Sequence, residues 1–385
     1  VQACVSAAVR HGVAFVARGA GTGLAGGAVP LDHALVIVTT KMTRILEVDA
    51  VNRIAWVEPG VLNLDLTRHV AHLGLHFAPD PSSQQSCSIG GNVANNSGGP
   101  HCLSDGVTTS HLLGAEVVLS DGSVVVLGGE SAEEQGLDLR GGFVGSEGMF
   151  GIATKLCVRL TQTPPAVKTL LIDFDSIDAG ARTVSAIIAD GMVPAALEMM
   201  DQLCVQAVEE YIHAGLPVDS AAVLLVEVAG LPHGVAADVE RIVEIAMDHG
   251  ALTVRIAQDE AERALLWKGR KNAFGAVARI KPNYYLHDTV VPRRMLAEVL
   301  GQVYEIVARH GLIVVNVFHA GDGNLHPLLV FDKREPGVMD RVRAAGEEIV
   351  RASVAAGGVL SGEHGIGLEK RDLMPLMFVP ADLEA

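Results

Sequence analysis

Cysteines are few, and none of them is arranged as a ligand of a metal cluster. The sequence has five in 385 residues, an odd number, scattered and without any C-x-x-C spacing: Cys4, Cys87, Cys102, Cys157 and Cys204. Iron–sulfur clusters require sets of closely spaced thiolates, and disulfide-bonded secreted folds require paired ones. The cysteine content therefore indicates a reduced, cytoplasmic protein that holds no iron–sulfur cluster of its own.

Basic residues and long apolar runs are also scarce. Lysine and arginine together number 29 against 45 acidic residues, for a formal net charge of −16. Because no basic run accompanies this balance, a nucleic-acid partner is excluded. The mean hydropathy is positive, +0.33, yet each apolar stretch is interrupted before the roughly 20 residues that a membrane-spanning helix requires.

The length and the glycine content indicate two domains around a ligand. A chain of 385 residues with 49% hydrophobic residues is long enough for two sizeable cores. Its 42 glycines are about half again the average share, and they are clustered. Pro164-Pro165 marks the expected boundary, with domains at 1–164 and 165–385. The sequence opens at Val1 without methionine and stops as a new segment begins at Ala385, so we expect a part of a longer chain, lacking residues at both ends.

Three glycine-rich segments precede the boundary. The first, residues 18–27, follows an expected strand and presents successive backbone N–H groups that suit a pyrophosphate. It is not a dinucleotide fingerprint, because no helix is expected directly after it, and a flexible surface loop is the alternative. The second, residues 79–99, contains Asn92 and Asn95, whose amides can bond the carbonyl and imide edges of a flat ring. With the third, residues 143–152, they predict one extended cofactor.

The pattern of apolar residues predicts short strands in the first domain and alternating strands and helices in the second. The first domain is expected to contain strands at 13–18, 35–40, 45–49, 53–57 and 152–160, a helix at 62–73 and a hairpin at 114–127. The second is expected to contain strands at 168–174, 222–228, 252–256 and 284–291, and helices at 178–189, 198–213, 235–249, 260–279, 293–310 and 336–356. This order predicts an α+β domain in which helices pack against an antiparallel sheet.

The segment Val314–Phe331 carries the strongest signal of chemistry. Asp322-Gly323 between two apolar runs favours a type I′ hairpin turn, which would place His319 directly opposite His326. Directly opposed side chains share one face, with Cβ atoms roughly 5 Å apart. Two imidazoles so placed can bind one divalent ion with a third ligand, and residues 361–367 (S-G-E-H-G-I-G) offer a carboxylate and another imidazole. Each histidine alone is more often a structural residue; the combination favours a metal site.

These segments resemble the flavin-linked oxidases of the vanillyl-alcohol oxidase fold. Residues 18–27, 79–99 and 145–152 are similar to the FAD-binding segments of that family, whose first domain is of the PCMH type. Residues 319–326 (H-A-G-D-G-N-L-H) and 362–367 (G-E-H-G-I-G) are similar to the substrate segments of its 2-hydroxyacid dehydrogenase branch. The resemblance covers essentially the whole chain, and it implies oxidation of glycolate, with D-lactate as the alternative.

The resemblance also implies roles for individual residues. His319, His326 and Glu363 would hold a divalent metal, with zinc expected, His364 would take the substrate hydroxyl proton, and Arg270 would bind the substrate carboxylate. Arg270 alone could equally be a surface residue of a helix. The residues implied to bind FAD are Arg18, Gly19, Ala20, Gly21, Thr22, Gly23, Gly26, Gly27, Pro79, Asp80, Ser82, Gly90, Gly91, Asn92, Asn95, Gly98, Gly99, Glu147, Gly148, Gly151 and Ile152.

Departures from the family refine these expectations. Related 2-hydroxyglutarate dehydrogenases carry a lysine aligned with Leu286 and a threonine aligned with Phe274, so a small monocarboxylate is favoured here. Residues 18–27 contain no histidine, so FAD is expected to be non-covalent. Electrons are expected to leave through separate iron–sulfur partner subunits, with membrane contact only peripheral and through them. The rival interpretations are a zinc hydrolase using the same ligands and a catalytically silent flavoprotein scaffold.

Overall fold

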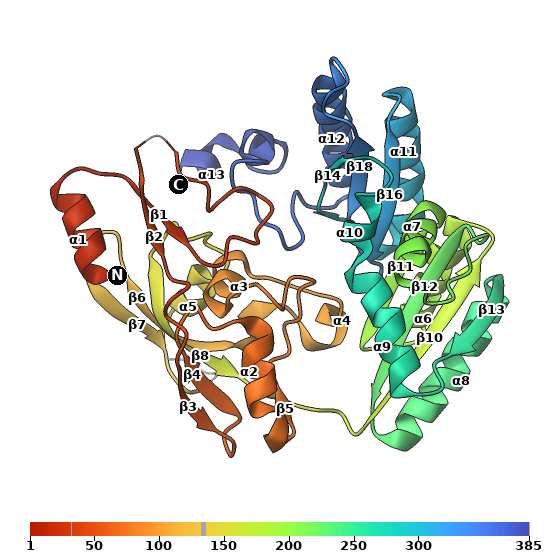
Figure 1. Ribbon diagram of the computed structural model, residues 1–385, viewed down its shortest axis with the longest axis horizontal. Helices are drawn as coiled ribbons and strands as arrows, with labels where there is room; N and C mark the ends of the chain where they lie inside the picture. The colour runs from red at the N-terminus through yellow and green to blue at the C-terminus, as the bar shows by residue number, and fades with distance from the viewer. Residues whose placement is uncertain (32, 132–135, 385) are drawn as a thin grey trace. The chain divides into compact units, whose positions relative to one another are not determined.

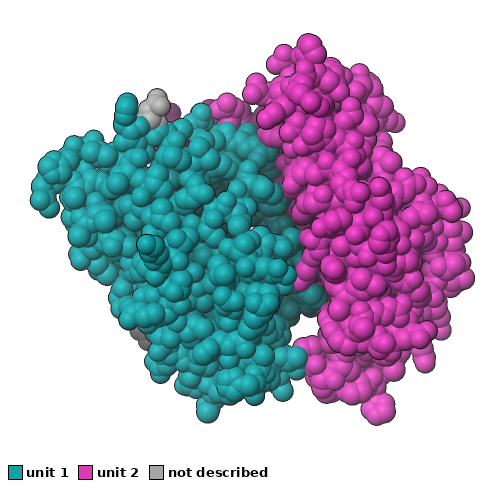
Figure 2. All heavy atoms as spheres, viewed as in Figure 1, with its two compact units in different colours: residues 1–163, 363–371 teal, residues 164–362, 372–385 magenta. Residues whose placement is uncertain are grey.

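The computed structural model describes residues 1–31, 33–131 and 136–384, and these form two compact units. Unit 1 comprises Val1–Thr163 and Glu363–Arg371, and unit 2 comprises Pro164–Gly362 and Asp372–Ala385 (Figure 2). The chain thus passes from unit 1 to unit 2 at Pro164, the first residue of the Pro164-Pro165 pair. Near its end it returns to unit 1 at Glu363 and enters unit 2 again at Asp372. The mixed fold with antiparallel sheets confirms the predicted α+β class.

Unit 1 is built on a mixed set of short strands, with an antiparallel sheet in the order β3-β4-β8-β6-β7 (Figure 1). A parallel pair, β1 and β2, and a small antiparallel pair, β5 and β9, accompany this sheet. The strands are β1 (Phe15–Arg18), β2 (Leu35–Val38), β3 (Ile45–Asp49), β4 (Ile54–Val57), β5 (Leu75–His76), β6 (Leu112–Val118), β7 (Val124–Gly128), β8 (Ile152–Arg159) and β9 (Thr161–Gln162). The helices are α1 (Gln2–Arg10), α2 (Asn63–Val70), α3 (Ile89–Asn95), α4 (Cys102–Asp105) and α5 (Leu139–Phe143), with 3-10 turns at Ala71–Leu73 and Thr108–His111.

One apolar core holds unit 1 together. Leu66 and Val70 of α2 and Ile89 and Val93 of α3 pack on the inward side chains of the sheet. Leu66, Val70 and Ile89 are fully buried, and a fully buried aliphatic side chain contributes about 1.5–3 kcal/mol. The two helices that border the glycine-rich segments are therefore fixed on the sheet.

Unit 2 is an antiparallel sheet with helices on both faces. Its main path runs β13-β10-β12-β11-β16-β17-β15, and β14 joins through β18. The strands are β10 (Ala166–Phe174), β11 (Ala196–Asp201), β12 (Ala222–Gly230), β13 (Ala251–Ile256), β14 (Asn283–Leu286), β15 (Thr289–Val290), β16 (Ile313–His319), β17 (Asn324–Leu325) and β18 (Pro327–Phe331). The helices are α6 (Ile177–Ala189), α7 (Gln202–Ile212), α8 (Pro232–Asp248), α9 (Glu260–Lys271), α10 (Ala273–Val277), α11 (Leu296–Arg309), α12 (Val338–Ala355) and α13 (Pro380–Glu384), with 3-10 turns at Arg293–Met295 and Arg371–Leu376.

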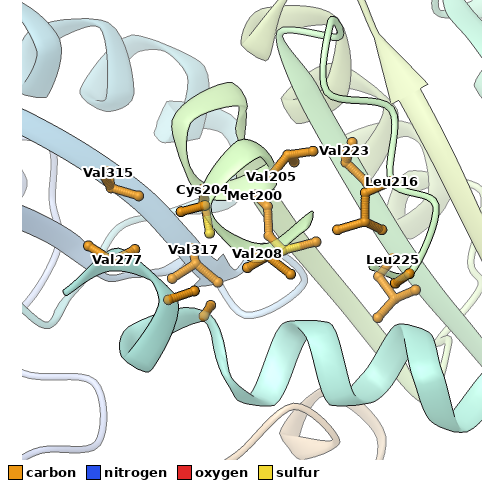
Figure 3. Close-up of a cluster of buried hydrophobic side chains, with 14 of the residues drawn as sticks. Met200, Cys204, Val205, Val208, Leu216, Val223, Leu225, Val277, Val315 and Val317 are labelled. Carbon is orange, nitrogen blue, oxygen red and sulfur yellow. The ribbon is translucent and has the colours of Figure 1, made fainter. Parts of the chain in front are cut away.

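A large apolar core lies between one face of this sheet and helices α7, α9 and α10. Figure 3 shows Val205 and Val208 of α7 beside Met200, Val315 and Val317 of the strands. All five are at most 1% exposed. This packing fixes α9 and the end of β16, where the polar residues of the next section lie.

Three element predictions are wrong in part. The strand expected at 284–291 is divided into β14 and β15 by His287-Asp288. The expected helix at 198–213 begins as a strand, because Ala196–Asp201 forms β11 between β12 and β16. Both faces of β11 are buried, so its sequence lacks the alternation of a half-exposed strand and cannot be distinguished from a buried helix by periodicity. The expected helix at 260–279 is interrupted at Asn272, which separates α9 from α10.

Candidate active site

A buried carboxylate joins an imidazole and a guanidinium on the α9 face of the unit 2 sheet. Glu198 of β11 lies directly opposite His319 of β16, and its Oε1 is 2.7 Å from Nδ1 of His319. Its Oε2 accepts from Nε of Arg270 at 2.7 Å and lies 2.6 Å from Nη2 of Arg270. The Glu198 and Arg270 side chains are 0% and 1% exposed. Arg270 is therefore an interior residue, which contradicts the alternative of a surface position.

The hairpin that carries the two histidines forms with a different turn from the one predicted. His319 pairs with Asn324, so four residues connect the strands. A type I′ turn requires positive φ at both central residues, but of Asp322 and Gly323 only Gly323, at 72°, has one. The prediction of a two-residue type I′ turn is wrong, and so is the expectation that His319 lies directly opposite His326.

The two imidazoles nevertheless share one face of the ladder. The register runs from His319–Asn324 to Asn316–Pro327, so His326 is displaced from the predicted position by two residues. A shift by two residues leaves each side chain on the same face, whereas a shift by one would reverse it. The ring centroids of His319 and His326 are 5.1 Å apart, at an interplanar angle of 84°.

Asp288, which the sequence analysis missed, lies beside the second histidine. Its Oδ1 is 3.8 Å from Nδ1 of His326 and accepts from Nδ2 of Asn324 at 2.7 Å. Its Oδ2 accepts from Oγ of Ser361 at 2.6 Å and from the N–H of Gly362 at 3.0 Å. This carboxylate, fully buried, therefore fixes the hairpin to the last residues of unit 2 before Glu363.

An apolar side chain borders the second histidine of the hairpin. The Phe274 ring stands edge-on to His326, with centroids 6.5 Å apart. Leu286 is 9% exposed and belongs to the same apolar core. Neither side chain can form an ion pair with a carboxylate.

In unit 1, a cavity of about 470 Å³ opens beside the first glycine-rich segment. This volume is within the range of about 300–1,000 Å³ typical of small-molecule sites. Ala20, a predicted cofactor residue, lines this cavity. The other residues of its wall were not among those predicted to bind a cofactor. The lining residues are Ala20, Thr40, Thr43, Ile45, Gly60, Val61, Leu62, Asp65 and Ser88. The feature of the sequence that could have indicated these lining residues is the Pro59-Gly60 turn after β4.

The first and second glycine-rich segments pack backbone against backbone within unit 1. A Cβ on Gly19 would lie only 2.6 Å from Oγ of Ser88 and 3.6 Å from the backbone N of Gly91. The side-chain amide of Asn92 points into the interior, where it accepts from Asn63 at 3.0 Å and donates to Sγ of Cys87 at 3.4 Å. A side chain at position 19 would therefore clash with the Ser88 hydroxyl.

The segment Glu363–Arg371 is held by the predicted cofactor residues of unit 1. Oε2 of Glu363 accepts from the N–H of Gly98 at 3.1 Å, and a Cβ on Gly98 would lie 2.8 Å from that oxygen. Nδ2 of Asn95 donates to the carbonyl of His364 at 3.1 Å. The Glu147 carboxylate accepts from the N–H groups of Ile366 and Gly367 at 2.6 and 2.8 Å. Asn95 and Glu147 therefore position the backbone around His364.

Burial changes the pKa of several groups around these elements. In unit 2, burial raises the pKa of Asp201 to about 6, although its carboxylate accepts from Tyr304 and Asn316. In unit 1, burial lowers the pKa of His76 and His111 below the ordinary histidine value. Asp201 caps α7 and binds the N–H of Asn316, so it fixes β16 three residues before His319.

The structure thus places the predicted residues in two groups, one in each unit. Unit 2 brings together Arg270, His319 and His326, and adds Glu198 and Asp288. Unit 1 brings together Glu363, His364 and the glycine-rich segments, and adds the wall of the cavity. The sequence analysis missed Glu198 because its strand was expected to be a helix. The feature that could have identified it is a single carboxylate inside the apolar run of a buried strand.

The profile of the FAD-linked oxidases, C-terminal domain, matches residues 163–385, and that of the FAD binding domain matches residues 1–128. The chain belongs to the FAD-linked oxidase family, and it is an FAD-linked oxidoreductase.

Among characterised relatives, the chain is similar to glycolate oxidase subunit GlcD of Escherichia coli (strain K12). The two are 48% identical over 378 residues, which cover 98% of this chain and 76% of that protein. GlcD of Bacillus subtilis is 41% identical, covering 97% and 80%. D-lactate dehydrogenase of Archaeoglobus fulgidus is 31% identical, covering 98% and 83%.

Solved structures agree on the fold alone. p-Cresol methylhydroxylase superimposes with a TM-score of 0.78 at 16% identity, covering 100% of this chain and 82% of that one. Alkyldihydroxyacetonephosphate synthase gives a TM-score of 0.76, also at 16% identity, covering 94% and 70%. The predicted PCMH-type first domain is confirmed by these neighbours. Among the described residues, no helix is both long and apolar enough to cross a membrane.

Proposed function

We propose that this chain oxidises glycolate to glyoxylate as the FAD-linked subunit of a glycolate oxidase, with D-lactate as the alternative substrate. The observation that carries the proposal is Arg270: Nη1 of this buried guanidinium has no hydrogen-bond partner among the described residues. Glu198 holds the other side of the guanidinium beside His319. A guanidinium binds a carboxylate as a planar fork, so Nη1 is suited to the carboxylate of a 2-hydroxyacid.

The residues of unit 1 fit FAD. The cavity of about 470 Å³ and the backbone-lined segment at Gly19 and Gly91 provide room and N–H groups, and residues 18–27 contain no histidine for a covalent link. We therefore assign FAD to this unit as a non-covalent cofactor, held mainly by residues before Pro164. When bound, FAD supplies the acceptor for the hydride that leaves the α-carbon of the substrate.

The donor set also fits a divalent ion. Nδ1 of His319 faces the Glu198 carboxylate, which can only accept, so Nδ1 carries the proton and Nε2 carries the lone pair. Nδ1 of His326 lies 3.8 Å from Oδ1 of Asp288, an ion-pair contact that is longer than a hydrogen bond. We assign His319, His326 and Glu363 as ligands of a divalent ion, with zinc expected, which would polarise the substrate hydroxyl.

Residues of the chain bind the substrate and accept its hydroxyl proton. Arg270 orients the substrate through its carboxylate, and Phe274 and Leu286 restrict the site to a small monocarboxylate. His364 accepts the hydroxyl proton through its imidazole while the α-hydrogen leaves as a hydride. The substrate thus loses one proton and one hydride and becomes the 2-oxo acid.

We further propose that iron–sulfur partner subunits take the electrons from the reduced flavin. The support is the cysteine arrangement: the five are scattered along the sequence without any C-x-x-C spacing, and Cys87, Cys157 and Cys204 are buried. The similar GlcD proteins are named as subunits of a larger enzyme. The odd number and scattered spacing of the cysteines also support a cytoplasmic location, peripheral at the inner face of the cell membrane through the partners.

An anaerobic reduction experiment tests the proposal. Glycolate added to the FAD-containing protein without oxygen is expected to bleach the flavin absorbance, and D-lactate to bleach it more slowly. Faster bleaching by D-lactate would select the alternative substrate. A flavin that stays oxidised with both acids would contradict the proposed function and favour a silent scaffold, while hydrolase activity without flavin reduction would favour the zinc hydrolase.

A further inference from the structure

We propose that Glu198 is a positioning residue that sets both the metal-binding imidazole of His319 and the substrate-binding guanidinium of Arg270. This inference rests on the proposed function, because it assigns to one carboxylate the control of two of its groups. Glu198 itself touches neither the substrate nor the flavin in this assignment.

The first part of the argument is geometric. Each oxygen of Glu198 serves one partner: Oε1 lies 2.7 Å from Nδ1 of His319, and Oε2 lies 2.7 Å from Nε of Arg270. The pairing of β11 with β16 sets Glu198 opposite His319, so the backbone ladder fixes the first contact. Arg270, which makes the second contact, lies in the last turn of helix α9.

The second part concerns which atoms remain for ligands. An ionised carboxylate only accepts, so His319 must hold its proton on Nδ1 and offer Nε2 to a metal. Nε of Arg270 donates to the same carboxylate, and Nη2 forms an ion pair with it at 2.6 Å. Neither Nη1 nor Nη2 has a hydrogen-bond partner among the described residues, and Nη1, which lies away from this ion pair, remains for a substrate carboxylate. One side chain therefore selects a tautomer and a guanidinium orientation together.

The third part separates this role from simple anchoring of a helix. A second buried carboxylate, Glu227 of β12, binds Arg263 of the same helix α9 through two contacts of 3.0 Å. Glu227 also accepts from Thr169 at 2.8 Å, and its side chain is 3% exposed. It has the chemistry and burial of Glu198, and it bonds Thr169, Arg263 and Trp267, none of which is a histidine of the site. Glu227 is therefore a matched control within the same sheet and helix.

The experiment compares Glu198→Gln with Glu227→Gln in the FAD-containing protein stripped of metal. We expect Glu198→Gln to weaken zinc binding, measured by direct titration, by roughly 10- to 100-fold, the usual effect of losing a partner of a ligating histidine. Saturating zinc should then restore kcat with glycolate, while KM stays raised because Arg270 is misaligned. Glu227→Gln should lower thermal stability and leave zinc affinity and KM unchanged.

A further variant covers a failure of Glu198→Gln to fold. Glu198→Asp keeps the buried charge but is one methylene shorter, so it cannot reach both partners and should show the same combined loss of zinc affinity and rise in KM. Zinc affinity and KM equal to those of Glu227→Gln in the folded Glu198 variants would overturn the inference. Failure of the unmodified protein to bind zinc or to reduce its flavin with glycolate would instead overturn the proposed function.

Discussion

The imidazole of His364 lies beside a carboxylate, with Nε2 3.8 Å from Oε1 of Glu363. Its backbone is held by Asn95 through the carbonyl, so the position of the ring does not depend on a contact made by the ring alone. A residue fixed through its backbone can lose its side chain without loss of the surrounding loop. The role of the imidazole as a base can therefore be separated from its structural role.

Replacing His364 by alanine should retain FAD and metal and slow flavin reduction by roughly 10²- to 10⁴-fold, the usual contribution of general-base catalysis. Stopped-flow absorbance under anaerobic conditions measures this rate. The exposed His11 replaced by alanine serves as the control and should leave the rate unchanged. An unchanged rate in His364→Ala would remove His364 from the mechanism.

Replacing His326 by alanine should remove bound metal and flavin reduction together and leave FAD in place, since FAD is assigned to unit 1. Metal analysis and the flavin spectrum of the purified variant check both parts. His233 of α8, which is exposed, replaced by alanine is the control. Metal retained at full stoichiometry in His326→Ala would show that the hairpin histidines are merely structural.

At the scale of single elements, the 3-10 turn Thr108–His111 links stability to pH. His111 donates through Nε2 to the carbonyl of Asp105 at 2.8 Å, and its ring packs edge-on to Phe77 with centroids 6.3 Å apart. Burial lowers the pKa of His111, partly offset by Asp105. Because the unfolded chain then binds more protons than the folded one, this group stabilises the fold above about pH 6.5 and loses that contribution as the pH falls.

The expected outcome is a melting temperature of unit 1 that falls between pH 7 and pH 5, and falls less in His111→Gln. The glutamine amide can still donate to Asp105 but does not titrate. Calorimetry across this pH range measures the slope, with the exposed His11→Gln as control. A slope in His111→Gln equal to that of the unmodified protein would contradict the assignment.

Glu147 gives a second prediction at this scale. Its carboxylate accepts from two successive backbone N–H groups, those of Ile366 and Gly367, and hydrogen bonds to charged groups contribute about 1.5–3 kcal/mol each. Glu147→Ala should therefore speed hydrogen exchange at these two amides by roughly 10- to 100-fold. Mass-spectrometric exchange of peptides covering 363–371 measures this. Glu130→Ala, which removes an exposed carboxylate, should not change their exchange.

The elements also show what the sequence could predict. Strands bounded by turn residues, such as β3 and β4, were located because their alternation and flanking residues are local signals. The face shared by His319 and His326 was predicted correctly although the turn was not, because a two-residue shift of register preserves the face. The register itself depends on pairing with β11, a strand distant in sequence, and Glu198 and Asp288 enter the site only through such pairing. Local periodicity contains no information about these contacts.

At the scale of the whole molecule, unit 1 contains the residues assigned to FAD, and none in the first glycine-rich segment can form a histidyl–flavin bond. Acid precipitation of the purified protein should therefore release its flavin to the supernatant. Absorbance of the pellet and supernatant checks this, with a protein carrying covalent FAD as the control. Flavin that remains in the pellet would contradict non-covalent binding.

The nine residues Glu363–Arg371 complete unit 1, but they are encoded after the 199 residues of Pro164–Gly362. At a synthesis rate of about 5–20 residues per second, they follow Thr163 out of the ribosome roughly 10–40 s later. During that interval the N–H of Gly98 and the carboxylate of Glu147 must be solvated by water. Unit 1 is thus expected to mature after translation of the unit 2 sheet, so the order of folding differs from the order of synthesis.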